Sequence, residues 1–167
     1  MESFVANIQF QNMIDVCAGW AFAFLVIWII TFASGLRSNL PLQAKNRLDG
    51  IRKLAIDLAN KFDENCPTPD VKDIVKGVRT IMRKQKKVDK LLQVYLYDHG
   101  DNMEISSSRG RLGKIGSYCR VSIQAITDEK LENVKSQMVL VERSARDAQD
   151  LLQVVIKKNE QEKLLRI

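Results

Sequence analysis

One segment of the chain limits what it can fold into: the 21 residues from Val16 to Leu36 contain no charged side chain. At about 1.5 Å of rise per residue, a helix of that length reaches about 30 Å, which is the thickness of the hydrocarbon core of a bilayer. A secretory signal would carry basic residues before a shorter apolar stretch, and residues 1–15 contain none. The segment therefore predicts a transmembrane helix at 16–36. A buried core helix is the alternative, although the rest of the chain would then have to cover it on all sides.

Charge is distributed unevenly around this segment. The chain has 26 Lys and Arg against 20 Asp and Glu, a net charge of +6, yet its first 35 residues contain no Lys or Arg. By the positive-inside rule, basic residues directly after a membrane helix place the C-terminal part in the cytoplasm. Five follow here: Arg37, Lys45, Arg47, Arg52 and Lys53.

Apolar residues recur at helical spacing in two segments that follow. Leu48, Ile51, Ala55, Leu58 and Phe62 predict an amphipathic helix at about 42–64. A second amphipathic helix is predicted from Val71 to Leu92, after a Pro-containing break. Together they predict a helical linker region at 37–92.

The pattern then changes to a period of two. Val94–Tyr97 and Met103–Ser106 predict a β-hairpin around a turn at 98–102. Residues 107–116 predict a loop, and 120–126 predict a further strand.

The end of the chain has the most regular pattern. An apolar seam with spacings of three and four predicts a long helix at about 129–160, which packs on its own domain or on a partner chain. The seam consists of Leu131, Val134, Met138, Val141, Ala145, Ala148, Leu152 and Val155. The predicted fold is a single-pass membrane protein: one N-terminal transmembrane helix, amphipathic helices, and a small α+β module at 93–167 with a long C-terminal heptad helix.

The sequence carries no motif that is specific for catalysis. It lacks the phosphate-binding, nucleophile-elbow and zinc-protease patterns, and its three Cys and one His have no metal-ligand spacing. We expect no enzymatic activity, no cofactor and no metal site. His99, between two aspartates, is expected to be a solvated turn residue.

The densest basic cluster lies on the polar face of the second predicted helix. It could meet anionic lipid, nucleic acid or only water, and a solvated helix face is the main expectation, so nucleic acid is not an expected partner. The cluster consists of Arg83, Lys84, Lys86, Lys87 and Lys90.

Asp15 is the one charged residue at the edge of the uncharged segment. Carboxylates near hydrocarbon often mark an ion path, and one at a helix start can also be a favourable N-terminal acid in interfacial water. The stretch from Asp15 resembles the membrane helix of the flagellar stator B subunit MotB, in which an aspartate is followed by Phe24-Leu-Val, Trp28 and then Ile and a hydroxyl residue, here Thr31. Ile8–Val16 is similar to the corresponding entry segment of ExbD and TolR, and the B subunit of the Zorya antiphage system belongs to the same class.

This resemblance implies a B-type subunit of a proton- or sodium-driven rotary membrane motor. Asp15 would be the ion-relay carboxylate, and Phe24, Trp28 and Thr31 would pack against the helices of a multi-pass A-type subunit. Two B subunits would sit inside a pentamer of A subunits, with region 37–167 as anchor or torque transmitter. The implied localisation is the inner (cytoplasmic) membrane with the N-terminus in the cytoplasm, which is opposite to the charge bias.

Motor B subunits of flagella and Zorya also carry an OmpA-like peptidoglycan-binding domain. Residues 123–128 are similar to a strand of that domain and 140–145 to one of its helices, although Ile126 replaces the family histidine. The resemblance implies Asp128 and Arg143 as candidate contacts to peptidoglycan or another envelope anchor.

The alternative hypothesis is a single-pass structural or scaffold subunit of a membrane complex with a cytoplasmic helical tail. In that case the apolar faces at 71–92 and 131–155 would dock on partner chains, and a coiled-coil end would replace the OmpA-like module.

Overall fold

The computed structural model of the chain describes residues 20–29, 39–62 and 70–165. The chain divides into two compact units, Met1–Ser38 and Asn39–Ile167. In the first unit, residues 20–29 form a helical segment, and the side chains of all ten residues are exposed.

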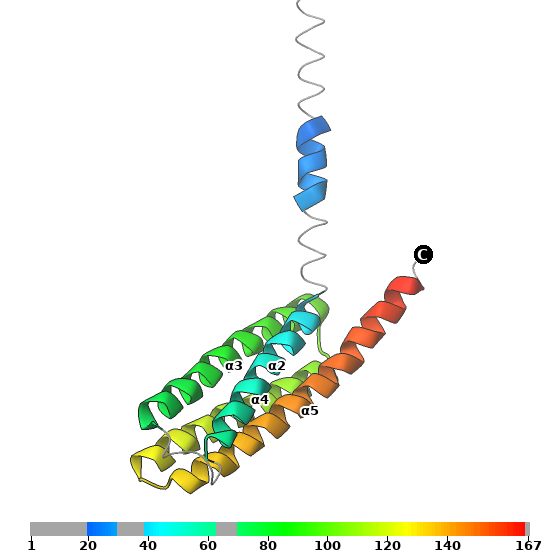
Figure 1. The fold of residues 1–167 in the computed structure, drawn as a ribbon. Helices are drawn as coiled ribbons and strands as arrows, with labels where there is room; N and C mark the ends of the chain where they lie inside the picture. Colours follow the sequence, from blue (N-terminus) through cyan, green and yellow to red (C-terminus); the bar gives the residue numbers. More distant parts are fainter. Residues whose placement is uncertain (1–19, 30–38, 63–69, 166–167) are drawn as a thin grey trace, which may run out of the picture. The chain divides into compact units, whose positions relative to one another are not determined.

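The second unit contains four helices: α2 (Leu40–Asn60), α3 (Val71–His99), α4 (Met103–Thr127) and α5 (Leu131–Leu164) (Figure 1). Each helix packs on the next, and α5 also packs on α2, so the four close into a ring with α3 and α5 at opposite corners. The three-residue connections at 100–102 and 128–130 make α4 antiparallel to α3 and to α5, and Figure 1 shows α2 running antiparallel to α3. The unit is therefore an up-down-up-down four-helix bundle.

Local sequence signals set the helix ends between α3 and α4. Gly100 ends α3 with a φ of 76°, a left-handed conformation that glycine adopts at little cost. Asn102 then begins α4, and its side-chain carbonyl accepts a hydrogen bond from the backbone N–H of Ile105 at 2.9 Å. Of the turn predicted at 98–102, residues 98 and 99 still belong to α3, and the remaining residues 100–102 join two helices instead of two strands.

One apolar core runs through the bundle, and every helix contributes a buried face to it. The long helix predicted at 129–160 is confirmed as α5, and seven of its eight seam residues, Val134 to Val155, are buried. The seam packs inside its own chain. The largest fully buried side chains are Leu48, Ile51, Ile74, Ile81, Leu92, Ile105, Leu112, Ile115, Met138, Leu152, Val78 and Val88.

The predicted α+β module is wrong, because the described part of region 93–167 consists of helices and their short connections, with no strand. Residues 94–97 continue α3, and residues 103–106, 107–116 and 120–126 all belong to α4. The fold class is corrected accordingly to all-helical for residues 39–62 and 70–165.

Two physical reasons account for the error. A four-residue alternation such as Val94–Tyr97 also satisfies a helix, and Tyr95 extends the buried face of α3 one turn beyond Leu92. In α4 the buried face includes small or polar residues such as Ser108, Gly116 and Ser122, so the hydrophobic period of a helix is faint in the sequence.

The membrane assignment is also corrected. Among the helices at 20–29, 39–62 and 70–165, none combines the length and the apolar character that crossing a bilayer requires. The ten described residues at 20–29 correspond to about 15 Å of helix, and the four bundle helices carry charged side chains along their length. This finding overturns the expected single-pass inner-membrane protein; the rest of the predicted helix at 16–36 lies outside the described residues.

Candidate functional site

The most distinctive surface of the bundle is a row of basic side chains on α3, here called the basic row. Its members follow one another at spacings of 4, 3, 4, 3 and 4 residues, so they share one face of the helix. Eighteen residues separate the first from the last, which is about 27 Å of helix. All six are exposed: Lys72, Lys76, Arg79, Arg83, Lys86 and Lys90.

The same helix buries its other face, which is why the basic row points outward. Ile74, Val78, Ile81, Val88 and Leu92 are fully buried in the core. A helix whose inner face is fixed by five such residues cannot rotate, so the row is held in place by the packing of α3.

The basic row has almost no internal counter-charge. None of its six side chains forms an ion pair with another described residue of the bundle. Asp89, which lies beside the row, already binds Arg109 of α4 with an Nε–Oδ1 distance of 2.8 Å. That hydrogen bond raises the pKa of Arg109. Over its whole length α3 has eight Lys and Arg against three Asp, a net charge of +5.

A surface groove of about 440 Å³ lies along the first half of the basic row. Four row members line it with Val71, Val75 and Thr80. Four of its seven lining residues are cationic, although apolar atoms, including the aliphatic parts of these side chains, make up more of the exposed lining than polar atoms do. The four positive charges and the nearby positive end of the α3 dipole favour an anionic group.

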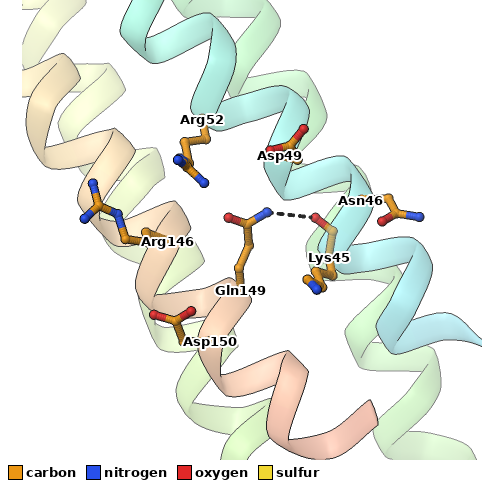
Figure 2. A pocket seen from close by; sticks show the side chains of 7 residues that line it. All are labelled: Lys45, Asn46, Asp49, Arg52, Arg146, Gln149 and Asp150. Carbon is orange, nitrogen blue, oxygen red and sulfur yellow. Dashed lines mark hydrogen bonds between the residues drawn. The ribbon is translucent and has the colours of Figure 1, made fainter. Parts of the chain in front are cut away.

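A second groove lies between α2 and α5 (Figure 2). Gln149, which is only 8% exposed, donates from Nε2 to the backbone oxygen of Lys45 at 3.2 Å. Arg52 and Arg146 approach the same carboxylate, that of Glu142, at 3.1 and 2.8 Å. These polar groups are already satisfied by one another, so this groove works as a clasp between the first and last helices of the bundle.

The basic patch predicted from the sequence is part of this surface. Arg83, Lys86 and Lys90 are members of the basic row. Lys87 is exposed beside it, whereas Lys84 is half-buried and its Nζ lies over α2, 3.0 Å from where a Cβ at Gly50 would stand.

Sequence reasoning missed the first half of the basic row. Lys72, Lys76 and Arg79 are separated from the predicted cluster by apolar residues and do not stand out as a run. Their spacing of 4 and 3 residues, continued to Arg83, was the signal that could have found them.

Of the motor-type site residues, Phe24 and Trp28 lie among the described residues. Asp15 and Thr31 lie outside the described residues, so the ion-relay role of Asp15 stays a prediction. Phe24 and Trp28 are exposed, at 67% and 65%, on the segment 20–29, and their packing role also stays a prediction.

The two candidate anchor residues lie apart on the surface of the bundle. Asp128 caps the end of α4 and accepts a hydrogen bond from Gln124 Nε2 at 2.9 Å. Arg143 is exposed three turns into α5, about 18 Å along the helix from Leu131. The strand on which Asp128 was expected to lie is absent from the described residues.

Cys119 and His99 are both engaged in packing within the bundle. Burial raises the pKa of the Cys119 thiol to about 12, which keeps it in the unreactive thiol form. His99, at the end of α3, stacks on Tyr95 with ring centroids 4.2 Å apart. It also contacts the Tyr95 backbone oxygen through Nδ1 at 3.1 Å.

The fold and the site define a class: an antiparallel four-helix bundle with a charged outer face on one helix. Comparison of the chain with protein-family models, with curated proteins and with solved structures finds no significant match.

Proposed function

We propose that the bundle is a non-catalytic binding module, a scaffold that docks an acidic macromolecule through the basic row of α3. The observation that carries this proposal is the row itself: six exposed cationic side chains on one rigid helix face, without ion-pair partners among the described residues.

The apolar faces of the helices are buried, so a partner would contact the bundle through its polar surface. The apolar faces at 71–92 and 131–155, which could have docked partner chains, fill the core of this chain instead. A scaffold role therefore depends on the charged outer face. It does not depend on the apolar heptad positions, because these are buried in the core of the bundle.

The energetics of the row also favour an external anion. Like charges three or four residues apart on a helix destabilise it by about 0.2–0.5 kcal/mol per pair. Successive members of the row stand in this relation, and Asp89 is engaged with Arg109. A bound polyanion would remove this repulsion, so the folded bundle gains stability on binding.

The test uses a polyanion with no protein or nucleic-acid structure. The full-length chain is applied to an immobilised sulfated polysaccharide and eluted with salt. The variant Lys76→Gln, Arg83→Gln, Lys90→Gln removes three charges from the basic row. It should elute at a clearly lower salt concentration than the unmodified chain.

A matched control removes the same charges from α5 and from the turn that precedes it. The variant Lys130→Gln, Arg143→Gln, Lys157→Gln also replaces two lysines and one arginine, and all three side chains are exposed. It should elute close to the unmodified chain. Equal shifts for the two variants would show that net charge alone determines retention and would refute the proposed docking surface.

A further inference from the structure

Resting on the proposed function, we infer that the basic row binds the phosphodiester backbone of a nucleic-acid duplex, largely without regard to base sequence.

The dimensions of the row match a polyanion of high, regular charge. It places one cationic group about every 5 Å over about 27 Å. A duplex carries one phosphate charge per about 1.7 Å of its axis, so phosphates outnumber the row's cations along any shared length. Each side chain can therefore reach a phosphate without a strict match of register.

The composition of the row favours phosphate over an acidic protein surface. Four of its members are Lys and two are Arg. Lys is depleted in the cores of protein–protein interfaces, which depend on aromatic and apolar anchors. Lys and Arg together are the usual partners of backbone phosphates. In the groove beside the row, Val71 and Val75 are the two lining residues with wholly apolar side chains, and neither is a large aromatic or aliphatic anchor.

The position of α3 in the bundle explains the expected lack of sequence preference. Both flanks of α3 are covered, by α2 on one side and α4 on the other. Reading base edges requires a helix to enter the major groove, whereas α3 offers only its outer face to a ligand. Contacts from that face reach phosphates, which position a protein but do not specify a sequence.

A duplex is favoured over a single strand. Binding of single strands depends on aromatic side chains on which bases stack. Continuing the row's spacing beyond Lys90 leads to Gln93 and then to Tyr97, which is 90% exposed. One tyrosine at the end of a 27 Å row does not make a stacking platform. This inference differs from the expectation from sequence, which did not include the first half of the row.

The experiment measures binding of the full-length chain by fluorescence anisotropy to four labelled or competing polyanions. These are a DNA duplex, an RNA duplex of the same sequence, the corresponding single strand and polyglutamate. Vesicles with anionic lipid serve as a fifth arm. Each is measured between about 50 and 200 mM salt, the range over which phosphate contacts lose most affinity.

The expected result is duplex binding that weakens by about 40- to 500-fold over this salt range, which corresponds to three to five phosphate contacts. The row variant should lower the slope of log K against log salt by about 3. The α5-side control should stay within about twofold of the unmodified chain. A scrambled duplex should bind equally well, and the DNA and RNA arms show which duplex is preferred.

Two outcomes overturn the inference, and they differ in what else they refute. If polyglutamate or vesicles bind through the row and duplexes do not, the partner is another class of polyanion and the proposed docking surface stands. If neither duplex binding nor polysaccharide retention depends on the row, the inference and the proposed function both fail.

Discussion

Helices α3 and α5 are the two longest in the bundle, with 29 and 34 residues, and they stand at opposite corners of the ring. Both bury an apolar face at helical spacing. In α5 six basic and six acidic residues cancel, whereas α3 has eight basic and three acidic residues. The buried faces of the two helices are alike in being apolar. The charge of the exposed faces therefore distinguishes α5, which stabilises the fold, from α3, which can bind a ligand.

Ion pairs follow the same division. Three residues of α5 form ion pairs with side chains on α2 and α4. These pairs are Glu142 with Arg52, Asp147 with Arg111, and Lys158 with Glu104. Lys158 lowers the pKa of the Glu104 carboxyl through its hydrogen bond. Helix α3 contributes Asp89 to a pair with Arg109, and no side chain of the basic row is paired with another described residue. The charged surface of α5 is used within the chain, and the basic row of α3 is left for solvent or a ligand.

Truncating one buried leucine on each helix tests most directly whether α5 contributes more to stability than α3. Leu152 of α5 and Leu92 of α3 are both fully buried. Replacing either with alanine should cost about 2–5 kcal/mol of unfolding free energy. Because α5 packs more extensively on its neighbours, Leu152→Ala should be the more costly. Urea unfolding measures both, and a larger loss for Leu92→Ala would contradict the central role given to α5.

Two glycines test how closely α3 packs on α2. A Cβ at Gly77 of α3 would stand 2.7 Å from Leu58 Cδ2 of α2. Gly77→Ala should therefore lower the unfolding free energy by about 1–3 kcal/mol through overpacking. Gly113 of α4 has open space around it, so Gly113→Ala should raise stability by about 0.5–1 kcal/mol through helix propensity. Chemical denaturation of both variants checks this, and a stabilising Gly77→Ala would show that α2 and α3 are packed loosely.

The core also contains the Cys119 thiol, whose ionisation lowers the stability of the fold at alkaline pH. The pKa of Cys119 is raised from 9.0 to about 12 by burial. Unfolded chains release this proton near pH 9, so the stability is fully present below pH 9 and is lost as pH rises toward 12. At pH 10 the loss should be about 1.4 kcal/mol relative to pH 8.

The thiol contribution is isolated by a variant. Cys119→Ala should lose less stability between pH 8 and pH 10 than the unmodified chain, by about the same 1.4 kcal/mol. Identical pH dependence for the two proteins would mean that the thiol reaches solvent in the native state.

The smallest loss of stability is expected from the row itself. The variant Lys76→Gln, Arg83→Gln, Lys90→Gln should not lower the unfolding free energy and should raise it, because the three side chains are exposed and their replacement relieves like-charge repulsion of about 0.2–0.5 kcal/mol per pair. The same variant is expected to weaken binding strongly. A large loss of stability would show that the row holds the fold and would remove the contrast with α5.

Strong periodicity was enough to predict α5 and most of α2 and α3 from the sequence. The buried seam from Val134 to Val155 has only apolar members, so its period is plain. In α4 the positions facing the core include Ser108, Gly116 and Ser122, and a hydrophobicity pattern does not register them. Local preference then favoured strands where tertiary packing imposes a helix.

The candidate site was predicted in part for a related reason. Arg83 to Lys90 forms a dense run, which composition alone reveals. The continuous row with Lys72, Lys76 and Arg79 becomes evident only when the helix is known to extend unbroken over both halves and to bury the opposite face. Ion pairing in three dimensions, such as Asp89 with Arg109, is beyond sequence patterns because the partners belong to different helices.

The clasp between α2 and α5 has a mechanical consequence. Because these antiparallel helices are the first and last of the bundle, the chain enters at Leu40 and leaves at Leu164 at the same end (Figure 1). Tension applied between the two ends would load this pair at its open end, where Lys45 contacts Gln149 and Gln153. The contacts between α2 and α5 would then break one after another, beginning at that end.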